Sequence, residues 1–192
     1  MTYLILGLIV FLGVHSVRIF ADGWRTVQLQ RLGEGAWKGI YSLLSIAGFG
    51  LIIWGMGLAR QDPVVLWAAP AAMRHVAALL SLVALVLLAA AYVPRNAIKA
   101  RMHHPMLLAV KVWAFAHLLA SGRLADTVVF GAFLAWATAA HIAARKRDRA
   151  AGTQFPAGTA GGTTLAVIVG AVAWAGLAFW LHTTLIGVRP FG

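Results

Sequence analysis

Residues 103–122 read HHPMLLAVKVWAFAHLLASG, an apolar stretch that carries three histidines and one lysine. Pro105 suits the first turn of a helix, so the pattern predicts a helix that begins there. His104 would lie at its entrance, with Lys111 about 20° away at ~100° per residue and His117 on a second polar face. Such side chains are costly inside a membrane and tend to face a bundle interior, so we expect the functional site along this helix.

The composition indicates a membrane protein. Of 192 residues, 61% are hydrophobic, and the mean hydropathy is +0.85, whereas soluble domains have an apolar share of about 45–50%. We therefore predict an all-α fold, a polytopic transmembrane helical bundle of six spans: about 3–20, 39–59, 73–93, the helix within 103–122, 124–144 and 165–186. Residues 1–144 would form a five-helix core, residues 145–164 a flexible basic and Gly/Ala/Thr-rich linker, and residues 165–192 the sixth helix with a short tail.

The charge pattern predicts an orientation. Most of the 16 Lys and Arg residues, which give a net charge of +11, fall around the first, third and fifth connections. By the positive-inside rule, these connections face the cytoplasm and both termini lie outside. The basic residues lie in short loops between apolar runs, which indicates contact with anionic lipid and no nucleic-acid partner.

The chain has no cysteine, which excludes disulfides, thiolate ligands and covalent haem attachment. All five acidic residues fall in or beside predicted loops, which argues against carboxylate-bridged metal centres and acidic proton relays within the spans. The candidate functional side chains that remain within the predicted spans are histidines, one lysine and tryptophans.

Each polar candidate has a functional and a structural interpretation. His15, late in the first span, and His117 are either ligands or buried histidines bonded to a carbonyl; Arg18 follows His15 and can reach the interface. Lys111 either extends to the interface or meets a ligand's negative charge. The remaining histidines, of which His75 lies one turn inside the third span, suit an interfacial position; the others are His103, His141 and His182.

Several spaced motifs resemble one family. They are FLGVHS at 11–16, RLGE at 31–34, YSL at 41–43, YVP at 92–94, HPM at 104–106, and then Lys111, Trp113 and HLL at 117–119. In this order they resemble the NnrU family of multi-pass bacterial membrane proteins associated with nitrite and nitric-oxide respiration. That family is similar to plant 15-cis-zeta-carotene isomerase, a membrane haem b enzyme with two histidine ligands to its iron.

The resemblance implies a haem b whose iron is held by His15 and His117. The resemblance also implies that the protein acts in redox chemistry or sensing, with an isomerase-like reaction as a further option. If the first and fourth spans are straight and full length, His15 and His117 differ in depth by about 10 Å, at 1.5 Å per residue. On depth alone His75 would pair with His117, which makes His75 the alternative ligand. Met106 stands where the isomerase has glutamine. Around the cofactor we expect His104, Lys111, Trp113 and Arg18, and as partners the lipid bilayer, haem, and a redox partner or nitric-oxide reductase components.

Two other functions remain open. The His-Pro dipeptide also resembles isoprenylcysteine and phospholipid methyltransferases, which bind S-adenosylmethionine, although Arg101 is not adjacent to His104 and Ala109 replaces an expected glycine. A non-enzymatic assembly or transport factor would use the same polar residues as a passage or an interaction site.

Overall fold

The computed structural model describes residues 1–191. Its elements are α1 (Thr2–Phe20), α2 (Asp22–Ala59), α3 (Ala72–Tyr92), α4 (Ala97–Met102), α5 (Pro105–Ala120), α6 (Leu124–Ala151) and α7 (Ala160–Gly176), which continues as the π-helical segment η1 (Leu177–Ile186). The predicted all-α bundle is confirmed. Five helices are long and apolar enough to cross a membrane: α1, α2, α3, α6, and α7 with η1. The fourth expected span is α5, whose 16 residues extend about 24 Å, less than the ~30 Å of a hydrocarbon core.

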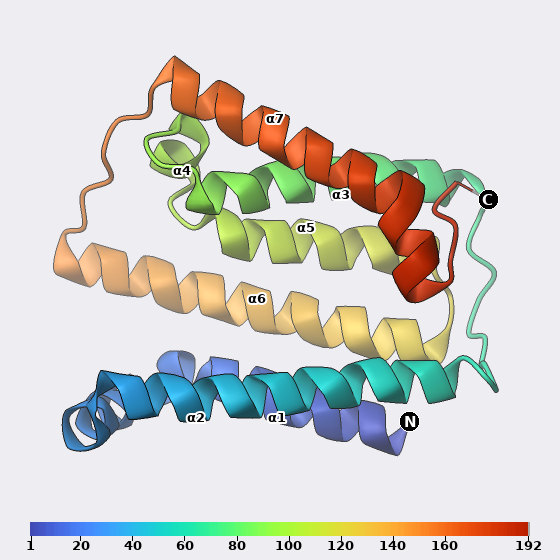
Figure 1. Ribbon diagram of the computed structural model, residues 1–192, viewed down its shortest axis with the longest axis horizontal. Helices are drawn as coiled ribbons and strands as arrows, with labels where there is room; N and C mark the ends of the chain where they lie inside the picture. The colour runs from blue at the N-terminus through green and yellow to red at the C-terminus, as the bar shows by residue number, and fades with distance from the viewer. Residues whose placement is uncertain (192) are drawn as a thin grey trace.

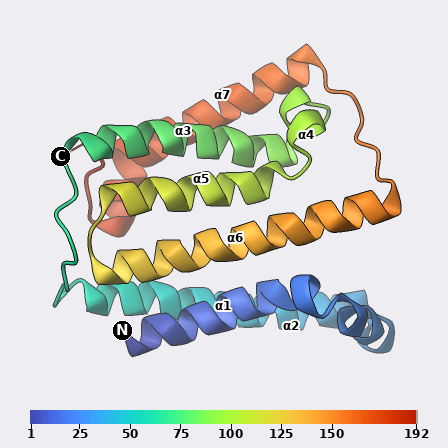
Figure 2. The same ribbon diagram turned by 180° about the vertical axis from the view of Figure 1, so that it is seen from behind.

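The helices pack in a row. α2 packs on α1, α1 on α6, α6 on α5, α5 on α3, and α3 on α7 (Figures 1 and 2). The connections after α1, α3 and α6 share one end of the molecule, which we call the basic end, while both chain termini lie toward the other (Figure 1). The first, third and fifth connections therefore lie together as the charge pattern requires. Which membrane face they occupy stays a prediction.

Hydrogen bonds join the connections at the basic end. Asn96, only 1% exposed, donates from Nδ2 to the carbonyls of Ala90 (2.9 Å) and Val93 (2.6 Å), and its Oδ1 accepts from the Lys99 amide (2.7 Å). This side chain caps α4, a short helix that the sequence did not predict. The Thr159 amide donates to the Arg95 carbonyl (2.7 Å), which joins the third connection to the fifth.

The opposite end is joined in the same way. The Leu66 amide donates to the Gly122 carbonyl (2.8 Å), and the Leu124 amide donates to the Val64 carbonyl (2.9 Å). A Cβ atom at Gly122 would overlap the carbonyl oxygen of Trp67. Gly122 therefore allows the second and fourth connections to touch, while α5 itself ends at Ala120 with Ser121 extended.

Glycines set the distance between α1 and α2. The second predicted span contains four glycines, and small residues of this kind favour close helix approach; they are Gly48, Gly50, Gly55 and Gly57. A Cβ at Gly48 would meet the backbone of Phe11, and one at Gly55 would meet the backbone of Leu4. Gly50 and Gly57 have nothing within 4 Å. Seven residues separate the two packed glycines, so they share one face of α2.

Two expected loops are helical. Residues 22–38 of the basic connector belong to α2, interrupted only at Gly33 (φ 80°, ψ 159°). The basic run 145–149, expected to begin the linker, continues α6 to Ala151, and Gly152 ends the helix in a left-handed conformation (φ 60°). At 145–149 the Lys and Arg residues are good helix formers and α6 supplies the nucleus, whereas at 22–38 the helix formers are Arg, Gln, Leu and Glu on the two sides of Gly33.

Candidate functional site

A cavity of about 620 Å³ lies at the basic end between α1, α2 and α6. It lies beside the kink in α2 at Gly33, whose positive φ (φ 80°, ψ 159°) interrupts the helix. The lining residues are Val14, His15, Val17, Arg18, Arg25, Leu29, Glu34, Trp37, Lys38, Tyr41 and Trp136. The cavity therefore has aromatic and aliphatic walls with a charged rim.

His15 is held in a fixed orientation in this wall. Its Nδ1 lies 2.7 Å from the Phe11 carbonyl oxygen, and because a carbonyl only accepts, Nδ1 is the donor, which leaves the lone pair of the neutral ring on Nε2. The imidazole stacks on Phe11 at 4.2 Å between centroids, with Tyr41 at 5.1 Å and Trp136 edge-on at 5.9 Å. Trp136 Nε1 is buried with no hydrogen-bond partner among residues 1–191.

The charges on the cavity lining are mainly positive. Arg18, Arg25 and Lys38 line it with one carboxylate, Glu34, which accepts from Lys38 at 2.7 Å. This bond and the Lys38 charge lower the pKa of the exposed Glu34 carboxyl. Arg25 lies 3.8 Å from Asp22, a loose ion pair. The excess of positive charge favours an anionic occupant.

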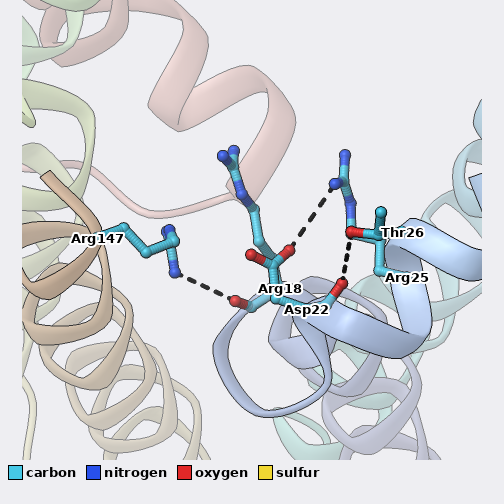
Figure 3. Close-up of polar contacts among 5 residues, drawn as sticks. All are labelled: Arg18, Asp22, Arg25, Thr26 and Arg147. Atoms are coloured by element: carbon cyan, nitrogen blue, oxygen red, sulfur yellow. Dashed lines mark hydrogen bonds and ion pairs between the residues drawn. The ribbon is translucent and has the colours of Figure 1, made fainter. Parts of the chain in front are cut away.

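Arg18 keeps its guanidinium available. Figure 3 shows the side chains of Arg18 and Arg25 extending to the same side of the turn between α1 and α2, with a dashed contact from Arg25 to Asp22. The Arg18 carbonyl accepts from Arg147 Nη1 at 3.2 Å, which ties α1 to the end of α6. The structure therefore brings together two predicted site residues, His15 and Arg18.

His117 lies in a different cluster. Its Nδ1 donates to the Trp113 carbonyl (2.8 Å), and its ring contacts Phe130 at 4.5 Å and Trp113 at 5.2 Å, with His182 of η1 at 6.5 Å. It does not line the cavity. A chain of aromatic rings, Phe11 to Phe133 (5.8 Å) and Phe133 to Trp113 (5.6 Å), runs from the His15 cluster to this one. The structure does not bring His15 and His117 together.

The other expected site residues also lie apart from the cavity. His75 has its ring 6.3 Å from Phe191, near the C-terminus. His104 Nε2 donates to Asp148 Oδ2 at 2.6 Å, on the α5 side of α6. Trp113 packs with His117, and Lys111 does not line the cavity. Within residues 1–191 no group of three or more His, Cys, Asp or Glu side chains is arranged to hold a metal ion.

Sequence reasoning missed three cavity residues. Tyr41 stands in the YSL motif without a role of its own, Arg25 falls in the first basic connection, and Trp136 falls in the apolar fifth predicted span. Tyr41 could have been found, because it belongs to the same set of motifs as His15. Trp136 gave no separate signal in the sequence.

The fold and the cavity define a multi-pass helical membrane protein with a basic, aromatic-lined site. The family model described as NnrU protein matches residues 3–190. The chain belongs to the NnrU family, as the motifs indicated. Comparison with curated proteins and with solved structures gives no match. The relation to the carotene isomerase stays a prediction.

Proposed function

We propose that this protein binds haem b in the cavity at the basic end, with His15 as iron ligand, and serves nitrite and nitric-oxide respiration at the bacterial inner membrane. One observation carries the proposal: a single cavity is lined by an imidazole whose Nε2 is free and by the guanidinium groups of Arg18 and Arg25. A neutral imidazole is a common axial ligand of haem iron. Arginine forms charge-assisted hydrogen bonds with carboxylates, here the haem propionates.

The cavity's size and walls also suit this group. Its volume of about 620 Å³ falls within the roughly 300–1,000 Å³ of ligand pockets, which are mostly apolar with a few polar groups that orient the ligand. Tyr41 and Trp136 offer aromatic surface beside His15. The unpartnered Nε1 of Trp136 is a donor that a bound group would satisfy.

The residues of this chain would bind and orient the group. The Phe11 carbonyl fixes the His15 tautomer and makes the imidazole a better ligand, as outer hydrogen bonds do for metal-bound histidines. Arg18 and Arg25 would hold the propionates at the basic end. When bound, the haem supplies an iron that exchanges electrons or binds a diatomic gas. The proposal assigns the iron one ligand from this cavity, and so differs from the pair that the resemblance implies.

The test is the haem content of the purified protein. We expect the wild type in detergent to show a Soret band and a reduced haem b spectrum with dithionite, and His15→Ala to lose both. His117→Ala is the matched control, because His117 is also an apolar-helix histidine whose Nδ1 donates to the carbonyl four residues earlier. It should keep its haem.

Three results would count against the proposal. A colourless wild type would exclude haem as the resident group. A red His15→Ala protein would place the ligand elsewhere. Loss of haem from both histidine variants would favour the two-ligand set over the single ligand. Arg18→Gln should weaken haem retention by about ten- to a hundredfold, since a hydrogen bond between charged groups contributes roughly 1.5–3 kcal/mol.

A further inference from the structure

A second polar cluster lies between α5 and α6, apart from the cavity. His104 is the N-cap residue of α5 and Lys111 lies within that helix, and His141, Arg145 and Asp148 follow one face of α6 at spacings of four and three. The two helices pack together. The His104 Nε2–Asp148 Oδ2 bond of 2.6 Å and the 5.9 Å between the His104 and His141 ring centroids bring these faces into contact.

The charges of this α5–α6 cluster do not balance. Asp148 is its one carboxylate, and it already accepts from His104. Lys111 and Arg145 form no ion pair within residues 1–191. The other acids that contact side chains bond elsewhere: Asp22 with Arg25, Glu34 with Lys38, and Asp126 with Ser121. Two basic side chains, Lys111 and Arg145, therefore lie in a cluster with one carboxylate, which is already bonded to His104.

One buried atom in the cluster also lacks a partner. His141 Nδ1 is shielded from solvent and makes no hydrogen bond among the described residues. The charged groups that act most on this ring are Lys111, His104 and Arg145. Buried polar atoms are nearly always satisfied. In the tautomer that carries the proton on Nδ1, a bound anion would accept from this atom as well as from the Lys111 and Arg145 side chains.

The place of the cluster in the fold identifies the anion. His104 and Asp148 lie at the basic end, at the start of α5 and near the end of α6, and the four-methylene stem of Lys111 is long enough to extend from within α5 toward that end. The ends of membrane helices are where lipid headgroups meet the chain. We propose that Lys111, His141 and Arg145 bind the phosphate of an anionic phospholipid, with the His104–Asp148 pair as one wall. Basic pockets between membrane helices bind such headgroups.

The experiment measures lipid binding to the detergent-purified full chain by native mass spectrometry. The probes are phosphatidylglycerol, phosphatidylcholine and inorganic phosphate, and the variants are Lys111→Met and Arg145→Gln. Lys146→Gln is the matched control, since Lys146 is exposed and adjacent to Arg145 but lies on another face of α6.

We expect phosphatidylglycerol to bind more tightly than phosphatidylcholine. Lys111→Met and Arg145→Gln should each weaken phosphatidylglycerol binding about fivefold, as expected for the loss of one basic group near the membrane surface. Lys146→Gln should bind like the wild type. Equal binding of the two lipids, or unchanged binding by both cluster variants, would overturn the proposal. Displacement of the lipid by millimolar inorganic phosphate would instead indicate a site for small free oxyanions and overturn the lipid assignment.

Discussion

A single methyl group at Gly48 should disturb the contact between α1 and α2 that frames the cavity. A Cβ at this position would lie 2.7 Å from the Phe11 amide nitrogen and 3.1 Å from Phe11 Cβ, whereas ordinary contacts fall at 3.4–4 Å. Phe11 is also the residue whose carbonyl orients His15. Gly50, two residues further along the same helix, has nothing within 4 Å. Gly48→Ala and Gly50→Ala therefore make a matched pair.

The expected magnitude follows from two opposing effects. Alanine is favoured over glycine in a helix interior by about 1 kcal/mol, and both variants gain this. At Gly48 the obstructing atom belongs to the backbone, so α1 must move by about 0.7 Å, the difference between 3.4 and 2.7 Å. Overpacking of this kind costs roughly 1–3 kcal/mol. Gly48→Ala should therefore be less stable than Gly50→Ala by about 1–3 kcal/mol, because the helix-propensity gain cancels in the comparison.

The assay is unfolding of the purified protein by SDS in mixed micelles, followed by far-UV circular dichroism and tryptophan fluorescence. Gly50→Ala should shift the midpoint upward or leave it in place, and Gly48→Ala should shift it downward with an unchanged slope. Equal midpoints for the two variants would refute the reasoning, because they would mean that α1 and α2 do not approach closely at Gly48.

Three other predictions concern the connections. Asn96→Ala removes a side chain that is only 1% exposed and makes three hydrogen bonds. It should lower the free energy of unfolding by about 1–3 kcal/mol. The measurement is the SDS midpoint, which should fall, and an unchanged midpoint would contradict the prediction. Gly122→Ala would overlap the Trp67 carbonyl and should speed amide hydrogen exchange in the loop before α3 but not within α6. Because Lys38 lowers the pKa of Glu34, the pair's contribution to stability is present above the usual carboxyl pKa and is lost as the pH falls through the lowered value. Lys38→Met should return the pKa of Glu34 toward its usual value in an NMR titration, and an unmoved pKa would show that Lys38 is not the cause.

The sequence by itself determined where the apolar helices lie and how they alternate in direction. The start of α5 at Pro105, its end before Gly122 and the bounds of α3 follow from local signals and apolar length. In a bilayer the backbone must satisfy its own hydrogen bonds, so a long apolar run has only the helix available to it. The basic connections lie at one end because successive spans alternate in direction. The same local reasoning failed at 21–38 and 145–149, where polar composition concealed good helix formers.

Only the tertiary structure decided which polar side chains meet. His15 lies with Tyr41 and Trp136, while His117 lies with Trp113 and Phe130. The spacing of residues along the chain does not predict that the two histidines belong to separate clusters. Such pairings depend on the rotation and depth of each helix. Those are set by close packing between helices, as where Gly48 meets Phe11, and close packing is a property of two surfaces rather than of one sequence pattern.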